Sequence, residues 1–337
     1  MSRRERRKRA AALLGAGIGS LTLWATASAH AATVRCDGFS WYTPASGGTL
    51  AFSAGEAERN NVTLTATKAG ALRLRDQGNR LQIERGSRSR LDQWQCQRRG
   101  AGVLMPAATQ WRTFELRLGA HPDRATLDLR PLAKSTGGTV RGGAGDDSLS
   151  LHGGASAIGV RVLGEAGNDH IALSWTEAPR LRRSVVDAPL FGPPFRRSTP
   201  AFLVGSGGPG DDVLEVTAPT THNRPLLVRE IRNTRPTGNY RDGSVRQFLL
   251  SGGDGDDLLI GNAGPDELDG GNGNDRIVAR GGGPDVLKGG RGDDRIELDG
   301  SAPIDGVRID CGPGDDTLVL NGHRAPPGDH ACETVLP

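Results

Sequence analysis

The chain has 337 residues, of which 50 are glycine and 20 proline, while only 36% are hydrophobic and 4% aromatic. This composition argues against a wide helix-packed core and, with 24% charged residues, excludes a polytopic membrane protein. The net charge is +3, but subtracting the +5 of residues 1–31 leaves −2 on the remainder, so overall basicity gives no argument for a nucleic-acid partner.

The first segment has the pattern of an export signal. Six basic residues between positions 3 and 9 precede an apolar run over residues 10–24, and small residues follow up to Ala31. The pattern predicts a signal peptide over residues 1–31, cleaved after Ala29 or Ala31. The run is short for a membrane span, so we expect a secreted, extracellular protein with no membrane span after cleavage; an uncleaved anchor is the alternative.

Residues 32–135 form a β-rich N-terminal region in this interpretation. Apolar and polar residues alternate over 62–65, 72–74 and 114–118, which is typical of strands. A degenerate nine-residue unit begins at Leu118 and retains Asp123, although His121 stands at its fourth position. The repeating part of the fold is therefore expected to begin before residue 136.

A nine-residue unit recurs through the rest of the chain, with glycine at its fourth position, an aspartate closing the turn and Leu or Ile at its eighth position. Five nearly contiguous copies fill residues 252–297, with Ala279 as one extra residue. Further copies begin at Gly142, Gly164, Gly207 and Cys311. The chain therefore divides into degenerate repeats over 136–251, tandem repeats over 252–297 and a C-terminal capping coil over 298–337. Insertions at 179–200 and 219–246 are predicted to be loops.

The unit has a direct physical interpretation. Glycines permit tight turns with positive φ and close approach of backbone oxygens, and the apolar eighth residue makes a short strand with one side chain pointing inward. Stacked units would bring carboxylates together, and the tandem run has eleven acidic against five basic residues. Such repulsion calls for a cation. Calcium prefers carboxylate and carbonyl oxygens, whereas zinc would require Cys or His clusters that this unit lacks.

These units resemble the G-G-x-G-x-D-x-U-x nonapeptide of RTX, or hemolysin-type, calcium-binding proteins. The resemblance implies an all-β, right-handed parallel β-roll or β-solenoid with calcium between turns, each turn pairing with the second one after it. The implied pairs are Asp257 with Asp275, Asp275 with Asp294, and Asp266 with Asp285. The export signal and the closing C-G-P-G unit are similar to those of signal-peptide-bearing repeat proteins of actinobacteria.

Two groups of candidate calcium ligands follow from the resemblance. The tandem repeats supply the first group: Asp257, Asp266, Asp275, Asp285 and Asp294. The isolated repeats supply the second group: Asp146, Asp169, Asp212 and Asp316. Because the second group has no neighbouring unit at eighteen residues, its sites are expected to be partial.

Four cysteines, Cys36, Cys96, Cys311 and Cys332, allow three pairings, and an even number in an exported chain favours disulfides. We predict pairing of nearest neighbours, Cys36 with Cys96 and Cys311 with Cys332. Free thiols are the alternative. A metal site is disfavoured because no C-x-x-C motif or His cluster accompanies them.

The sequence favours a secreted protein that folds on binding calcium outside the cell and has a structural or adhesive, non-enzymatic role. Neither H-E-x-x-H nor G-x-S-x-G occurs. One alternative is a glycoside-type hydrolase on a β-helix scaffold. Another is a module that binds polyanions or cell-wall or surface polysaccharide through arginines of the first insertion: Arg180, Arg182, Arg183, Arg196 and Arg197.

Overall fold

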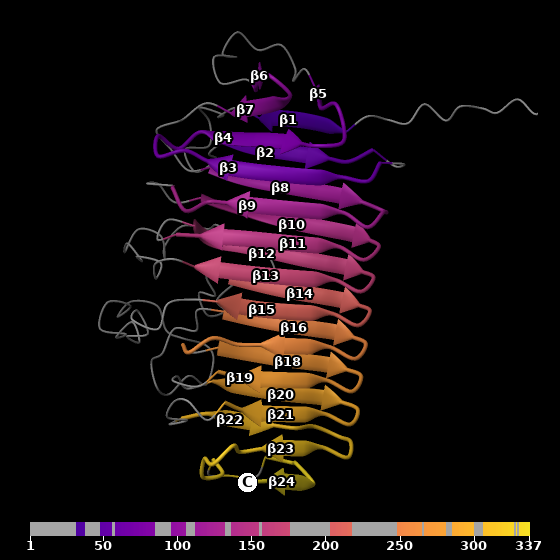
Figure 1. Cartoon of the computed structure of the whole chain (residues 1–337), viewed down its shortest axis with the longest axis vertical. Helices are drawn as coiled ribbons and strands as arrows, with labels where there is room; N and C mark the ends of the chain where they lie inside the picture. The colour runs from indigo at the N-terminus through magenta and orange to yellow at the C-terminus, as the bar shows by residue number, and fades with distance from the viewer. Residues whose placement is uncertain are drawn as a thin grey trace, which may run out of the picture.

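The fold is seen in a computed structural model, which describes residues 32–37, 48–55, 58–84, 96–105, 112–131, 136–154, 157–175, 203–217, 248–264, 266–280, 285–299, 306–326, 328 and 330–337. The strands lie roughly perpendicular to the long axis of the molecule, and their order along this axis largely follows the sequence (Figure 1). The predicted signal peptide over residues 1–31 lies outside the described residues.

Two long sheets extend along the molecule and enclose the core between them. The first, sheet A, has 11 strands in the order β22 (Arg308–Asp310), β20 (Val286–Arg291), β18 (Asp266–Asn272), β16 (Phe248–Asp254), β14 (Leu203–Pro209), β12 (Ala157–Ala166), β10 (Thr136–Ala144), β8 (Arg112–Gly119), β2 (Gly48–Ser53), β1 (Thr33–Asp37) and β5 (Gln82–Ile83).

The second, sheet B, has 13 strands in the order β24 (Thr334–Leu336), β23 (Thr317–Val319), β21 (Arg295–Leu298), β19 (Arg276–Ala279), β17 (Leu258–Ile260), β15 (Val213–Thr217), β13 (His170–Trp175), β11 (Ser148–Gly153), β9 (Arg124–Asp128), β3 (Asn61–Ala66), β4 (Leu72–Asp76), β7 (Gly102–Met105) and β6 (Gln97–Arg99). From β2 and β3 onward, neighbouring strands in each sheet are parallel. The protein is therefore an all-β parallel solenoid, as predicted.

Each coil of the solenoid contributes one strand to each sheet, which gives the molecule two different edges. Sheet A leads into sheet B through short turns, such as residues 255–257 between β16 and β17; we name this the turn edge. Sheet B leads back to sheet A on the opposite side, which we name the insertion edge. Both long insertions, residues 176–202 and 218–247, belong to the insertion edge by their place in the chain. The loops predicted at 179–200 and 219–246 lie outside the described residues.

The core is a narrow column of apolar side chains between the sheets. The eighth residues of successive repeats are opposite one another in sheet B, so that Leu259 pairs with Leu214 on one side and Ile277 on the other. In sheet A, Leu268 is opposite Leu250 and Leu287. All of these side chains are fully buried. Because each coil buries only a few such residues, neighbouring coils must stack to form a continuous core.

The N-terminal end of the solenoid is closed by antiparallel pairing. β1 pairs with β2, β3 with β4, and β7 with both β4 and β6. The buried aromatic residues Phe52 and Phe114 belong to the core in this part of the molecule. The stretches predicted as strands at 62–65, 72–74 and 114–118 lie within β3, β4 and β8, respectively.

Two disulfides secure the ends of the described structure. Cys36 is bonded to Cys96, and Cys311 to Cys332, with Cα–Cα distances of 5.5 and 5.3 Å, respectively. The nearest-neighbour pairing predicted from the sequence is therefore confirmed. Among the described residues, no helix is long and apolar enough to cross a membrane.

Because both long insertions leave from one edge, the coil stack should not depend on them. Replacing residues 218–247 with the five-residue connection 261–265, which joins β17 to β18 at the same edge, should leave the β-type far-UV circular dichroism unchanged and the midpoint of thermal unfolding within about 5 °C. A variant that loses its β signal would show that the insertion is part of the stack.

Candidate metal centre

The turn edge carries a column of repeat turns that continues from coil to coil. The turns begin at Gly142, Gly164, Gly207, Gly252, Gly270, Gly289 and Cys311. Their tight shape needs a backbone that side chains disfavour: Gly271 and Gly273, the second and fourth residues of one turn, have φ values of 122° and 134°. The turns end at an aspartate that directly precedes a strand of sheet B.

These aspartates form a hydrogen-bonded column, which we name the inner ladder. Each backbone N–H donates to the Oδ1 atom of the aspartate one coil further on, over N–O distances of 2.7 to 2.9 Å. All members are at most 4% exposed. The inner ladder consists of Asp123, Asp147, Asp169, Asp212, Asp257, Asp275, Asp294 and Asp316.

The second oxygen of each of these carboxylates is buried without a hydrogen-bond partner. This holds for the Oδ2 atom of every member of the inner ladder. Burying an uncompensated carboxylate costs several kcal/mol, so such a column requires either protonation or a cation.

Burial shifts the acidity of the inner ladder in the same direction throughout. Desolvation raises the pKa of Asp147, Asp212, Asp257 and Asp294 to about 7 and that of Asp169 and Asp275 to about 6. It also raises the pKa of Asp123 and Asp316. The backbone N–H bond to each Oδ1 opposes the shift, and neighbouring carboxylates add to it.

The first glycine of several turns lies against oxygen atoms of its own coil and of the next coil. A Cβ atom added to Gly252 would overlap with Asp257 Oδ2 and lie 2.6 Å from the carbonyl oxygen of Gly270 in the next coil. The same two kinds of oxygen surround Gly142, Gly164 and Gly270. At these levels of the turn edge, a carboxylate oxygen therefore lies close to a carbonyl oxygen of the following coil, and these are the kinds of oxygen that calcium prefers.

The side chains alone do not make a metal site. In the part of the chain that the structure describes, no group of three or more His, Cys, Asp or Glu side chains is placed to hold a metal ion. Backbone carbonyls would therefore supply most of the ligands, and each aspartate would add its Oδ2 atom. This donor set suits calcium, whereas zinc takes nitrogen and sulfur side-chain ligands.

The N-terminal level of this column shows what these oxygens attract. Asn60 precedes β3, where later coils have aspartate, and its backbone N–H donates to Asp123 Oδ1. Its Nδ2 atom donates to the carbonyl oxygens of Leu118 and Glu58, over 2.8 and 3.0 Å. Leu118 occupies the first position of its unit, so a positively polarised amide lies against the kind of carbonyl that adjoins Oδ2 in other coils.

An outer ladder runs along the exposed side of the same turns. Its residues occupy the fifth position of each unit, and the backbone N–H of each donates to the side-chain oxygen of the residue one coil earlier. This direction is opposite to that of the inner ladder. Each turn therefore donates one N–H to the following coil and another to the preceding coil. The outer ladder consists of Asp146, Asn168, Asp211, Asp256, Asn274, Asp293 and Asp315.

The structure corrects the assignment of Asp146. Asp146 is the fifth residue of its unit and lies in the exposed outer ladder, whereas Asp147 is the sixth residue and lies in the buried inner ladder. Two adjacent aspartates follow the fourth glycine of this unit, which allowed the error of one position. Asp147, rather than Asp146, is therefore the candidate ligand.

The isolated repeats have neighbours in space, although none lies at a spacing of eighteen residues along the chain. Asp169 receives the N–H of Asp147 and donates its own to Asp212, which in turn donates to Asp257. The long insertions leave from the opposite edge, so units separated by 43 and 45 residues are adjacent in space. Asp316 continues the column after Asp294.

The predicted pairs of the tandem repeats are adjacent in the structure. Asp257 donates to Asp275, and Asp275 to Asp294, on the turn edge. Asp266 donates its N–H to Asp285 Oδ1 over 2.9 Å on the insertion edge. The five tandem units therefore divide between the two edges, three on one and two on the other.

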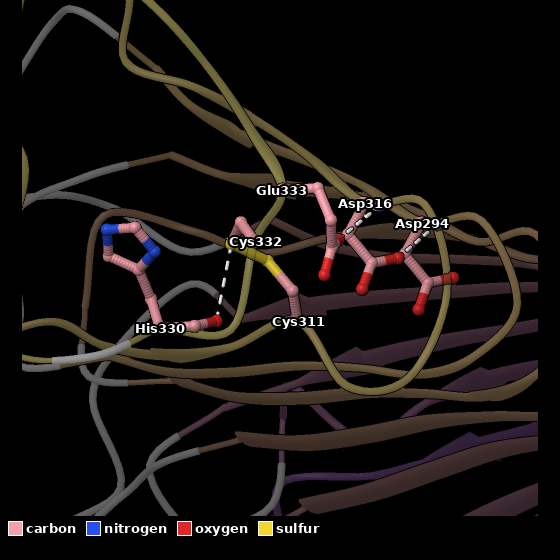
Figure 2. The surroundings of a disulfide bond; sticks show 6 residues. All are labelled: Asp294, Cys311, Asp316, His330, Cys332 and Glu333. Carbon is pink, nitrogen blue, oxygen red and sulfur yellow. Dashed lines mark hydrogen bonds between the residues drawn. A yellow bond between two sulfur atoms is a disulfide. The ribbon is translucent and has the colours of Figure 1, made fainter.

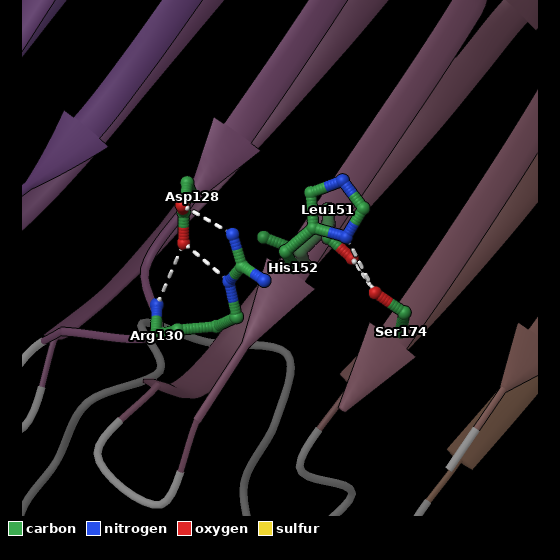
Figure 3. Close-up of polar contacts among 5 residues, drawn as sticks. All are labelled: Asp128, Arg130, Leu151, His152 and Ser174. Atoms are coloured by element: carbon green, nitrogen blue, oxygen red, sulfur yellow. Dashed lines mark hydrogen bonds and ion pairs between the residues drawn. The ribbon is translucent and has the colours of Figure 1, made fainter. Parts of the chain in front are cut away.

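A second polar constellation lies on sheet B, away from the turns. Asp128, His152 and Ser174 occupy matching positions on β9, β11 and β13, and Ser174 Oγ lies 2.6 Å from His152 Nδ1 (Figure 3). Arg130 binds both oxygens of Asp128, over 2.9 and 2.7 Å, and lowers the pKa of this carboxyl group. The carboxylate is thus engaged by Arg130, and the row does not have the hydrogen-bond pattern of a catalytic triad.

Comparisons with known proteins agree with the geometry of the turns. The family model of the RTX calcium-binding nonapeptide repeat matches residues 137–156, 251–282 and 281–302, with four copies of the repeat. No curated protein and no solved structure matches the chain.

The raised pKa values predict how stability depends on pH. A carboxyl group whose pKa is higher in the folded protein than in the unfolded chain stabilises the fold below about pH 4, and this contribution is lost as the pH rises to about 7. In calcium-free buffer, the midpoint of thermal unfolding should therefore fall between about pH 5 and about pH 8. Added calcium should raise the midpoint more at the higher pH, because it competes with protons for the same oxygens.

The control for this experiment is Asp275→Asn, which removes one of the shifted groups and should reduce the dependence of the midpoint on pH. If the midpoint of thermal unfolding of the calcium-free wild-type protein rose from pH 5 to pH 8, protonation of the inner ladder at the lower pH would be contradicted.

The oxygen-lined space predicts the effect of a single methyl group. Gly270→Ala would place Cβ against Asp275 Oδ2 and 2.5 Å from the carbonyl oxygen of Gly289, so it should lower the free energy of unfolding by about 1–3 kcal/mol in calcium-containing buffer. The matched control is Gly78→Ala, whose Cβ would have its nearest neighbour at 3.7 Å and which should be nearly neutral. Urea unfolding of both variants measures the difference, and similar losses would argue against the crowded space.

Proposed function

We propose that this chain, which carries RTX calcium-binding nonapeptide repeats, is a secreted protein that completes its folding by binding calcium along the turn edge. The observation that carries the proposal is the inner ladder, in which eight buried aspartates each present an unpartnered Oδ2 atom. Bound calcium would supply the positive charge that these oxygens need.

The two oxygens of each aspartate have separate tasks in this proposal. Oδ1 accepts the N–H of the preceding coil and fixes the spacing between turns, as in the pair of Asp257 and Asp275. Oδ2 points to the space beside the first glycine, where the carbonyl oxygen of the next coil converges. Each ion would then connect two coils, so that binding at one level orders its neighbours.

The setting of this folding switch is extracellular in our proposal. Repeat modules of this kind outside the cell bind calcium in the range of about 0.1–1 mM, so the column would remain without calcium in the cytosol and fill after export. The N-terminal signal pattern and the two disulfides support this setting.

We propose a non-catalytic, structural or adhesive role for the folded protein. The rigid column of coils supports this role, and so does the engagement of Asp128 by Arg130, which leaves the Ser174 and His152 pair without an orienting carboxylate. Cell-wall or surface polysaccharide is the partner class that we propose, because the insertion over residues 176–202 is rich in arginine.

A calcium titration of the mature chain tests the function. The β-type far-UV circular dichroism and the midpoint of unfolding should both increase with calcium and change little with the same concentration of magnesium, because magnesium demands a smaller, octahedral and more hydrated site. Isothermal titration calorimetry should give several ions per chain. No binding at millimolar calcium would refute the proposal.

The ladder assignment is tested by a pair of substitutions with the same chemistry. Asp275→Asn removes a buried carboxylate with an unpartnered oxygen and should weaken calcium binding by roughly tenfold or more at the adjoining sites. Asp146→Asn, in the exposed outer ladder, should leave calcium binding close to that of the wild type. Equal effects of the two substitutions would refute the assignment.

A further inference from the structure

The last residues of the chain have the register of one more repeat. Residues 328–336 read GDHACETVL, and β24 pairs with β23 so that Thr334 is opposite Thr317 and Val335 is opposite Leu318. This alignment gives Glu333 the sixth position, where the other units have aspartate. Ala331 then has the fourth position, and its φ is also positive, at 52°, whereas the fourth glycines of the turns from Gly145 to Gly292 have φ values of 118–138°.

Glu333 continues the hydrogen bonds of the inner ladder beyond its last aspartate, although Glu333 itself is exposed. The backbone N–H of Asp316 donates to Glu333 Oε2 over 2.8 Å, as each earlier aspartate donates to the next coil. Asp316 is fully buried, and its Oδ2 atom has no hydrogen-bond partner. The carboxylates of Asp294, Asp316 and Glu333 follow one another in a row, with the disulfide beside them (Figure 2).

The disulfide joins the turns that carry Asp316 and Glu333. Cys311 is the first residue of the turn that ends at Asp316, and Cys332 immediately precedes Glu333. The backbone N–H of Cys311 also donates to the carbonyl oxygen of His330 over 2.9 Å. β24 pairs with β23 over three residues, and its Val335 and Leu336 are 42% and 41% exposed. The covalent bond therefore restrains a segment that buries little apolar surface.

From these contacts, we propose that Asp316 and Glu333 form a terminal calcium site and that the Cys311–Cys332 disulfide keeps it assembled. Asp316 Oδ2 and Glu333 Oε1 would provide the carboxylate oxygens, while Glu333 Oε2 holds the backbone of Asp316. This inference rests on the proposed calcium binding by the inner ladder, but it concerns residues outside the repeat pattern.

The experiment compares the oxidised wild-type chain with Glu333→Gln, which retains an oxygen for the Asp316 N–H and removes the negative charge. Glu115→Gln is the matched control, because Glu115 lies on β8 and its carboxylate pairs with Arg117 rather than with a turn. Calorimetric titration with calcium should show one site weakened roughly tenfold or lost in the Glu333 variant and an unchanged count in the control.

The rate of disulfide reduction provides a second, local measurement. Linkage requires that, if the disulfide favours calcium binding at this site, calcium must also favour the disulfide. Calcium should therefore slow the reduction of Cys311–Cys332 by dithiothreitol, followed by thiol labelling and mass spectrometry. The effect should be smaller in the Glu333 variant, and the Cys36–Cys96 bond serves as an internal reference.

The outcomes separate the terminal site from the wider proposal. Wild-type binding with the same count, affinities and reduction rates in the Glu333 variant would overturn the terminal site and leave the inner ladder in place. Absence of calcium binding by the wild-type chain would overturn both proposals. A selective loss of one site, with faster reduction of Cys311–Cys332 in calcium, would support the terminal site.

Discussion

The structure depends on a column of buried carboxylates in which only one of the two oxygens has a hydrogen-bond partner. Each aspartate of the inner ladder uses one oxygen to bind the backbone of the preceding coil and leaves the other without a partner. The first contact makes the stack regular, and the second makes it costly while the group is charged. A single residue type therefore sets the spacing of the coils and links their stability to the charge of the turn edge.

The two edges differ in how much their length can vary, which explains how repeats at unequal spacings in the sequence form a regular column of coils. The turns of the turn edge keep nearly the same length because the hydrogen bonds of both ladders link each turn to the next. The number of residues between consecutive turns varies mainly with the length of the connection at the insertion edge. Connections on the insertion edge range from the three residues 154–156 between β11 and β12 to the segment 218–247. Insertion there costs loop-closure entropy alone, which grows slowly with length.

Much of this arrangement could be predicted from the sequence, and the failures have physical causes. The strand period follows from the local pattern, the pairs Asp257–Asp275 and Asp266–Asp285 are implied by the resemblance to the RTX nonapeptide, and the choice of nearest-neighbour cysteines gave both disulfides. The continuity through Asp169 and Asp212 could not be predicted, because separation along the chain conceals adjacency when an insertion leaves from the far edge. At Asp146, two consecutive aspartates follow the fourth glycine, and the buried one is Asp147, which holds the sixth position of the motif.

The ends of the column were missed for another reason, since there the ladder position is kept while the residue type changes. Asn60 holds the N-terminal position with an amide, whose N–H groups satisfy the carbonyl of Leu118 without an ion. Glu333 holds the C-terminal position with a carboxylate, which adds charge beside the buried Asp316. The first end is moreover closed by antiparallel strands around Phe52 and Phe114, whereas the last coil is closed by a three-residue strand and a disulfide. The two ends of the column are therefore closed differently: the N-terminal end has antiparallel strands and a neutral amide, and the C-terminal end has a short strand, a disulfide and a carboxylate.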